Sequence, residues 1–207
     1  MKNLTILLVV LLLLGCSTTK EKLNVSSVKY FDEYNAEINK SKFYRRRATN
    51  KVLDIQLDSF NYKLIKREER GFVDRNIIDS IISTKLNISI DSQKAIVIIY
   101  YPGKDECNSG GIKNEMWIKN WYNQLVDNVT MMIGDKPIFI FKDDVGLEAI
   151  DTIVTWHKDP DRFIENRFFK YHYPCKSFVV IANNGNYESY FGEFPLEYVF
   201  ETINKTN

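Results

Sequence analysis

The sequence predicts a mixed α/β domain that follows a secretion signal and a smaller α+β segment. Three apolar runs rich in β-branched and aromatic residues predict buried strands, at residues 95–101, 138–141 and 177–182. The segments between these runs carry apolar residues at spacings of three and four, which is typical of helices that bury one face. The Asn-Asn-Gly-Asn sequence at residues 183–186 predicts a tight hairpin turn, because Asn and Gly tolerate positive φ.

The N-terminus has the pattern of a secretion signal. Residues 4–14 form a mostly apolar run that is too short to span a bilayer comfortably. Residues 13–16, Leu-Leu-Gly-Cys, resemble the lipobox of bacterial lipoproteins. This resemblance implies that a signal peptide of residues 1–15 is cleaved and that Cys16 carries lipid, such as palmitate. The alternative is an ordinary cleaved signal peptide with an incidental cysteine.

The residues after Cys16 suggest where the protein is anchored. Residues 16–25 are small and polar and predict a lipidated tether. Bacterial lipoproteins that are retained in the inner membrane usually have an Asp directly after the lipidated cysteine. Ser17 stands at this position, so the resemblance implies an outer-membrane lipoprotein that faces the periplasm. The implied partners are the membrane, through the lipid on Cys16, and another envelope protein. Several acyl chains at roughly 0.8 kcal/mol per buried CH2 would hold the chain on a membrane stably.

The charge balance argues against nucleic acid as a partner. The net charge of +1 falls to zero when the signal peptide, with its one lysine, is removed. Such a chain has no global field that attracts nucleic acid. The basic run at residues 45–47 predicts a solvated face, or a surface near anionic lipid headgroups, rather than a nucleic-acid site.

Residues 26–90 are expected to form an N-terminal extension. Residues 25–50 carry aromatic and charged residues without a clear period and are left unassigned. The patterns that follow predict two strands that could form a hairpin, one amphipathic helix and one short strand, at residues 51–57, 60–65, 73–85 and 87–90.

Residues 91–207 are expected to form the main domain around the three buried strands. The patterns predict helices at residues 117–129, 147–154 and 163–169, a strand at 187–194 that returns antiparallel, and a final helix opened by Pro195. Two strands joined through a helix should be parallel, with a right-handed crossover, and the hairpin adds an antiparallel edge.

The resulting order of strand, helix, strand, helix, hairpin, helix is similar to the thioredoxin fold, over residues 94–204. Cys107 follows the first buried strand, and Tyr173-Pro174-Cys175 stands just before the hairpin. The resemblance implies a thioredoxin-like three-layer α/β/α sandwich with a mixed sheet, in which Cys107 opens the first helix and Pro174 is a cis-proline candidate. The family's Cys-x-x-Cys motif is altered here, because Gly110 replaces its second cysteine.

The two remaining cysteines are an even pair in an exported chain, where disulfides persist. The resemblance implies that Cys107 and Cys175 are neighbours in space. They are then a structural disulfide, a redox pair in which Cys107 is the nucleophile and Cys175 resolves, or unpaired cysteines with another use. The corresponding functions are a binding or accessory protein and a thiol-disulfide oxidoreductase. An unrelated α+β lipoprotein is the third possibility.

Cofactor motifs are not apparent in the sequence. His172 could supply three zinc ligands together with the two cysteines, but no fourth ligand is obvious, and His157 lies elsewhere. The acidic pairs at residues 143–144 and 159–161 lack the spacing of a calcium loop and are explained by strand ends and turns. The sequence therefore predicts neither a metal site nor a cofactor.

Overall fold

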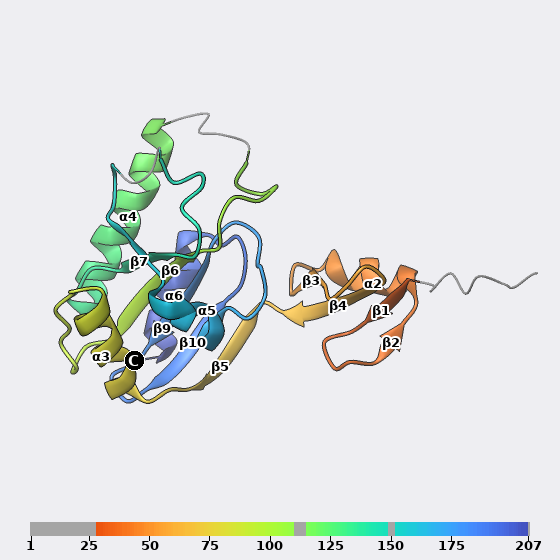
Figure 1. The fold of residues 1–207 in the computed structure, drawn as a ribbon, viewed down its shortest axis with the longest axis horizontal. Coiled ribbons are helices and arrows are strands. Elements are labelled where there is room, and N and C mark those ends of the chain that lie inside the picture. Colours follow the sequence, from red (N-terminus) through yellow and green to blue (C-terminus); the bar gives the residue numbers. More distant parts are fainter. Residues whose placement is uncertain (1–27, 110–114, 149–151, 207) are drawn as a thin grey trace, which may run out of the picture.

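The described part of the chain contains two mixed β-sheets and five α-helices (Figure 1). The computed structural model describes residues 28–109, 115–148 and 152–206. The expected signal peptide, Cys16 and the expected tether lie outside these residues. Among the helices that are described, none is both long and apolar enough to cross a lipid bilayer.

The smaller sheet has the strand order β2-β1-β4-β3. Its strands are β1 (Lys29–Phe31), β2 (Glu37–Ile38), β3 (Val52–Gln56) and β4 (Asn61–Lys66). The antiparallel pair of β3 and β4 confirms the hairpin expected from the sequence. Helix α2 (Lys40–Arg47) begins at its N-cap Asn39 and buries Phe43 against Val52 and Leu64. The unassigned residues 25–50 thus supply β1, β2 and α2.

The larger sheet has the strand order β5-β10-β9-β6-β7-β8. Its strands are β5 (Glu68–Phe72), β6 (Ile96–Tyr101), β7 (Ile138–Phe141), β8 (Trp156–Lys158), β9 (Ser177–Ile181) and β10 (Asn186–Tyr190). Strands β6, β7 and β8 run parallel, whereas β9 is antiparallel to β6 and to β10. The three buried strands and the hairpin expected from the sequence are therefore confirmed.

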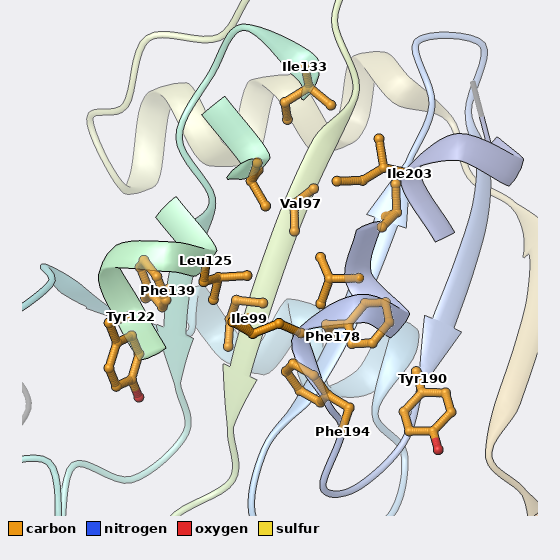
Figure 2. Packing of buried hydrophobic residues seen from close by; sticks show 14 of the residues in the cluster. Val97, Ile99, Tyr122, Leu125, Ile133, Phe139, Phe178, Tyr190, Phe194 and Ile203 are labelled. Atoms are coloured by element: carbon orange, nitrogen blue, oxygen red, sulfur yellow. The ribbon is translucent and has the colours of Figure 1, made fainter. Parts of the chain in front are cut away.

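Helices cover both faces of the larger sheet. Successive side chains of β6 point to opposite faces, so this strand contributes residues to the core on each side. Val97 and Ile99 belong to the cluster that contains α4 (Glu115–Ile133) and α6 (Leu196–Thr206), shown in Figure 2. Ile96 and Ile98 belong to the opposite cluster, with α3 (Arg75–Lys85) and α5 (Phe163–Phe168). All six residues of β6 are buried, as a strand covered on both sides requires.

Two expected elements differ in the structure. Residues 87–90 form a loop whose Ile88 and Ile90 pack against the core without a strand partner. The described part of the expected helix 147–154 is not helical; Leu147 and Ile153 pack individually on the core, and β8 follows them. In both places the apolar residues pack against the core from a loop and do not form a helix or a strand.

The boundary expected at residue 90 also differs, because β5 and α3 belong to the larger sheet and its cover. Strand β5 pairs antiparallel with β10, where Gly71 lies opposite Tyr187. A Cβ atom on Gly71 would meet the Tyr187 ring at 2.7 Å, so the absent side chain makes room for the ring. Arg70 forms a 2.7 Å ion pair with the buried carboxylate of Glu188 on the neighbouring strand.

The smaller sheet contacts the larger unit through β3 and the end of β4. Leu53 of β3 belongs to the core cluster that includes Phe191 and Tyr173. The Nη1 atom of Arg67, which follows β4, donates hydrogen bonds to the carbonyl oxygens of Phe191 and Glu193, at 3.5 and 3.0 Å. The loop after β10 is therefore held by residues of the smaller sheet and of the segment that follows it.

Candidate functional site

The candidate site begins where β6 ends. Pro102 and Gly103 stop the strand, and Gly103 has a φ of 115°, which favours glycine. The Asn108 side chain then fixes the loop: its amide donates to the Gly103 carbonyl at 2.9 Å, and its oxygen accepts from the backbone N–H of Asp105 at 2.9 Å. Local hydrogen bonds thus define the conformation of the loop that carries Cys107.

Cys107 and Cys175 are joined in a disulfide, with their Cα atoms 5.2 Å apart and 68 residues apart in the sequence. Cys107 is exposed and lies in a turn at residues 106–109, whereas Cys175 is half-buried and precedes β9. The structure thus brings together the two cysteines that the sequence singled out.

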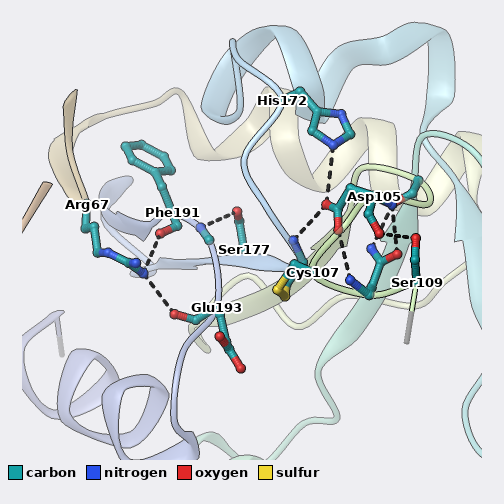
Figure 3. Close-up of a disulfide and its surroundings, with 12 residues drawn as sticks. Arg67, Asp105, Cys107, Ser109, His172, Ser177, Phe191 and Glu193 are labelled. Carbon is teal, nitrogen blue, oxygen red and sulfur yellow. Dashed lines mark hydrogen bonds and ion pairs between the residues drawn. A yellow bond between two sulfur atoms is a disulfide. The ribbon is translucent and has the colours of Figure 1, made fainter. Parts of the chain in front are cut away.

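Asp105 provides a second connection between the same two segments (Figure 3). Its Oδ2 atom accepts a 2.8 Å hydrogen bond from the backbone N–H of Cys175 and lies 3.3 Å from Nε2 of His172. The side chain of Asp105 is only 13% exposed. His172 therefore faces Asp105 and not the two sulfurs.

Pro174 differs from its expected state. The described residues contain no cis peptide bond, so the bond between Tyr173 and Pro174 is trans, which corrects the cis-proline candidate. The chain turns at Cys175 instead, whose φ is 64°, a left-handed conformation that is uncommon for residues other than glycine.

The loop between β10 and α6 forms one side of the site. The backbone N–H of Gly192 donates a 3.0 Å hydrogen bond to Oγ of Ser177. A carboxylate oxygen of Glu193 and the two cysteine sulfurs all lie within 4.8 Å of one another. Three such atoms could hold a metal ion, but sulfurs bonded to each other are not thiolates, and only thiolates ligate strongly.

Lys176 follows Cys175 and lies against two aromatic rings. Its Nζ atom is 5.5 Å from the ring centroids of both Trp121 and Tyr122 on α4. Burial lowers the pKa of the Lys176 ammonium to about 8, while Glu193 and Asp105 oppose this shift. The site therefore contains a partly desolvated cation together with two carboxylates.

Comparison of the chain with protein-family models, with curated proteins and with solved structures finds no match.

Helix α4 does not begin at Cys107. The described part of α4 starts at Glu115, eight residues after the cysteine. The positive end of a helix dipole is felt within about its first turn. Within the described residues, the expected activation of Cys107 by a helix N-terminus is thus not found.

Three residues of the site were not singled out from the sequence: Asp105, Lys176 and Glu193. The first two carried a usable signal, because they lie within two residues of a cysteine. Glu193 had no such signal, since only the turn after β10 brings it to the disulfide. His157 lies away from this group, on β8, where burial lowers the pKa of its imidazole.

Proposed function

We propose that this chain is an exported, lipid-anchored envelope protein of thioredoxin-like fold, which serves as a binding or accessory protein and uses the Cys107–Cys175 disulfide as a structural clamp. The strand order β10-β9-β6-β7, with β6 and β7 parallel and the other pairs antiparallel, supports the thioredoxin-like assignment. The lipobox-like residues 13–16 support export and lipidation at Cys16.

One observation carries the structural role of the disulfide: the Cys107 loop is tied to the Cys175 segment twice. The disulfide is one tie, and the hydrogen bond from the Cys175 N–H to Asp105 is the other. In addition, the carboxylate of Glu193 next to both sulfurs opposes the formation of a thiolate. A thiol that ionises poorly is a weak nucleophile in disulfide exchange.

The clamp is tested by the midpoint potential of the Cys107–Cys175 pair. The protein from Ser17 to Asn207 keeps every described residue and lacks the Cys16 thiol, so thiol counting against dithiol redox buffers reports on this pair. We expect a potential below about −300 mV, which is typical of structural disulfides in secreted proteins. A potential between about −120 and −270 mV would contradict the clamp.

Lipidation is tested separately in the full chain. We expect a bacterial host to incorporate radiolabelled palmitate into the wild-type protein but not into Cys16→Ala. Labelling that persists in Cys16→Ala would contradict the assignment of the lipid to this cysteine.

A second candidate function, thiol-disulfide oxidoreductase, is favoured by the exposure of Cys107. In the reduced protein the Cys107 thiolate would attack a substrate disulfide and form a mixed disulfide, and one substrate sulfur would leave as a thiolate and take up a proton. The Cys175 thiolate would then attack the Cys107 sulfur, release the second substrate sulfur and re-form the Cys107–Cys175 disulfide, which a dithiol reductant in the assay reduces again. Reduction of insulin or isomerisation of scrambled disulfides, abolished by Cys107→Ser, would establish this function over the clamp.

A further inference from the structure

The net charge is divided unevenly between the two units. Residues 28–67, which form the smaller sheet and α2, contain ten Lys and Arg against five Asp and Glu, a net charge of +5. Residues 68–207 contain fifteen Lys and Arg against twenty-one Asp and Glu, a net charge of −6. The near-zero charge of the whole chain therefore conceals a strongly basic N-terminal unit.

Helix α2 concentrates this charge, since five of its eight residues are basic and its first turn contains no acid. Arg46 and Arg47 form ion pairs with Glu33 and Asp54. Three other side chains are exposed and pair with no acid among the described residues; they are Lys40, Lys42 and Arg45.

The position of two of these residues is unfavourable for the helix itself. Lys40 and Lys42 lie in the first turn, where the positive end of the helix dipole disfavours cations. The Nζ atom of Lys40 lies 5.9 Å from the centroid of the Tyr44 ring on the same helix, whereas helix stability does not explain Lys42. A residue that breaks a local rule often serves a function elsewhere.

Exposed apolar side chains lie at the end of this unit where β1 begins and where β3 turns into β4. Val28, Leu57 and Phe60, which we call the tip, are 46%, 47% and 45% exposed. The backbone N–H of Lys29 donates a 2.7 Å hydrogen bond to the Phe60 carbonyl, which joins the start of β1 to the β3–β4 turn. Because β1 and β2 are antiparallel and Tyr30 pairs with Ile38, the start of α2 lies at this end too.

We propose that the tip and the first turns of α2 rest on an anionic lipid bilayer, with the tip in the interface and Lys40, Lys42 and Arg45 at the headgroup phosphates. This inference relies on the proposed lipid anchor for the location of the protein. The twelve residues from Cys16 to residue 27 reach at most about 40 Å when fully extended. They lead directly to Val28 at the tip, so an anchored chain keeps this end close to the membrane.

The energies involved are sufficient for contact. A Lys or Arg near an anionic membrane surface contributes about 1 kcal/mol, which is about a fivefold change in binding for each charge. The larger unit has a net negative charge, so the anionic bilayer would repel it and turn it away from the membrane. The surface thus orients the anchored protein in a way that a lipid tether alone does not.

Sedimentation with lipid vesicles tests the proposal on the unlipidated protein from Ser17 to Asn207. We expect binding to phosphatidylcholine vesicles that contain phosphatidylglycerol and none to phosphatidylcholine alone. Raising the salt from 0.1 M to 1 M shortens the Debye length from about 10 to about 3 Å and should release the protein. The triple variant K40Q/K42Q/R45Q should bind about a hundredfold more weakly. The matched control K119Q/K158Q changes exposed lysines of the larger unit and should bind like the wild type.

Quenching by brominated lipid tests the contact of the tip. A tryptophan introduced by Phe60→Trp should be quenched on anionic vesicles, whereas one introduced by Phe72→Trp, on the exposed edge of the larger sheet, should not. The proposal is overturned if the wild type ignores anionic vesicles, if the triple variant binds equally well, or if both tryptophans behave alike. A dimer that is disrupted by Phe60→Ser, without vesicle binding, would also overturn it in favour of a second copy of this chain. The protein carries no lipid here, so a failure of Cys16 lipidation leaves these results unaffected.

Discussion

The backbone N–H of Cys175 donates a 2.8 Å hydrogen bond to Oδ2 of Asp105, a residue two positions before the disulfide partner of Cys175. The hydrogen bond and the disulfide therefore join the same pair of segments. Each one holds the other in register, because the loss of either frees the Cys107 loop to move away from the segment before β9. Their contributions to stability should depend on each other.

Removal of the disulfide should lower the stability of the fold substantially. The bond closes a loop between residues separated by 68 positions, for which the chain-entropy relation gives about 4 kcal/mol. We expect Cys107→Ser, Cys175→Ser and the double variant to lower the free energy of unfolding in urea by similar amounts. A double variant that loses about twice as much as either single variant would show that the cysteines act independently.

The Asp105 carboxylate should stabilise the disulfide as well as the fold. In Asp105→Ala the Cys175 N–H loses its acceptor in a partly buried position, which costs about 1–3 kcal/mol. We expect urea unfolding to show this loss and the midpoint potential of the disulfide to rise, because the oxidised form loses a tie. The matched control is Asp143→Ala, which alters an exposed acid at the end of β7.

A thermodynamic cycle separates this role from general damage to the loop. In the Cys107→Ser background, Asp105→Ala should cost less than in the wild type, because the segment is already free. Equal costs in both backgrounds, or an unchanged midpoint potential, would refute the coupling.

The sequence predicted the buried strands because their continuous apolar runs need cover on both faces, as β6 shows with all six residues buried. It did not predict β5, since the residues Glu-Glu-Arg-Gly-Phe lack an apolar pattern. That strand is specified by its neighbour β10, through the Arg70–Glu188 ion pair and the Tyr187 ring opposite Gly71. Pairing of this kind cannot be predicted from the residues of β5 alone, because it depends on the residues of the partner strand.

The candidate site divides in the same way. Cys107 and Cys175 were found because cysteines are rare in the chain and because the order of the predicted elements resembles a fold that places these positions close together. The prediction of a cis peptide bond before Pro174 was wrong. The bond is trans, and the left-handed backbone of Cys175 makes the turn before β9. Glu193 could not be found, since its place beside the sulfurs depends on the path of the chain after β10.

Gly192 should be intolerant of a side chain, because it lies where the two units meet. Its φ is 77°, and a Cβ atom there would lie 3.2 Å from Cδ1 of Leu53 and 3.4 Å from Cγ of Pro174. We expect Gly192→Ala to lower the free energy of unfolding by about 1–3 kcal/mol, through backbone strain and crowding. Urea unfolding measures the effect.

Leu53→Ala offers a matched test of the crowding at Gly192. Because it removes the Cδ1 atom, Gly192→Ala should cost less in that background than in the wild type, leaving mainly the backbone strain. A full cost in the Leu53→Ala background would show that the contact between these residues is unimportant.

Lys176 should give the protein a distinctive dependence of stability on pH. Burial lowers the pKa of its ammonium from 10.5 to about 8 in the folded protein. Below pH 8 the lysine is charged in both states, and the folded state carries the full cost of burying the charge. Between pH 8 and about 10.5 the unfolded chain binds the proton more strongly, so folding becomes more favourable as the pH rises. Lys176→Met carries no charge, so the stability of the wild type relative to this variant should increase across that window.

Urea unfolding of the protein from Ser17 to Asn207 at several pH values measures this difference, and NMR of labelled lysines measures the pKa directly. The control is Lys158→Met, which makes the same replacement at an exposed lysine of the edge strand β8. A Lys176 ammonium that titrates near 10.5, or a Lys176→Met difference that does not change between pH 8 and 10.5, would show that water reaches the amine. In that case the rings of Trp121 and Tyr122 would not exclude solvent from this edge of the site.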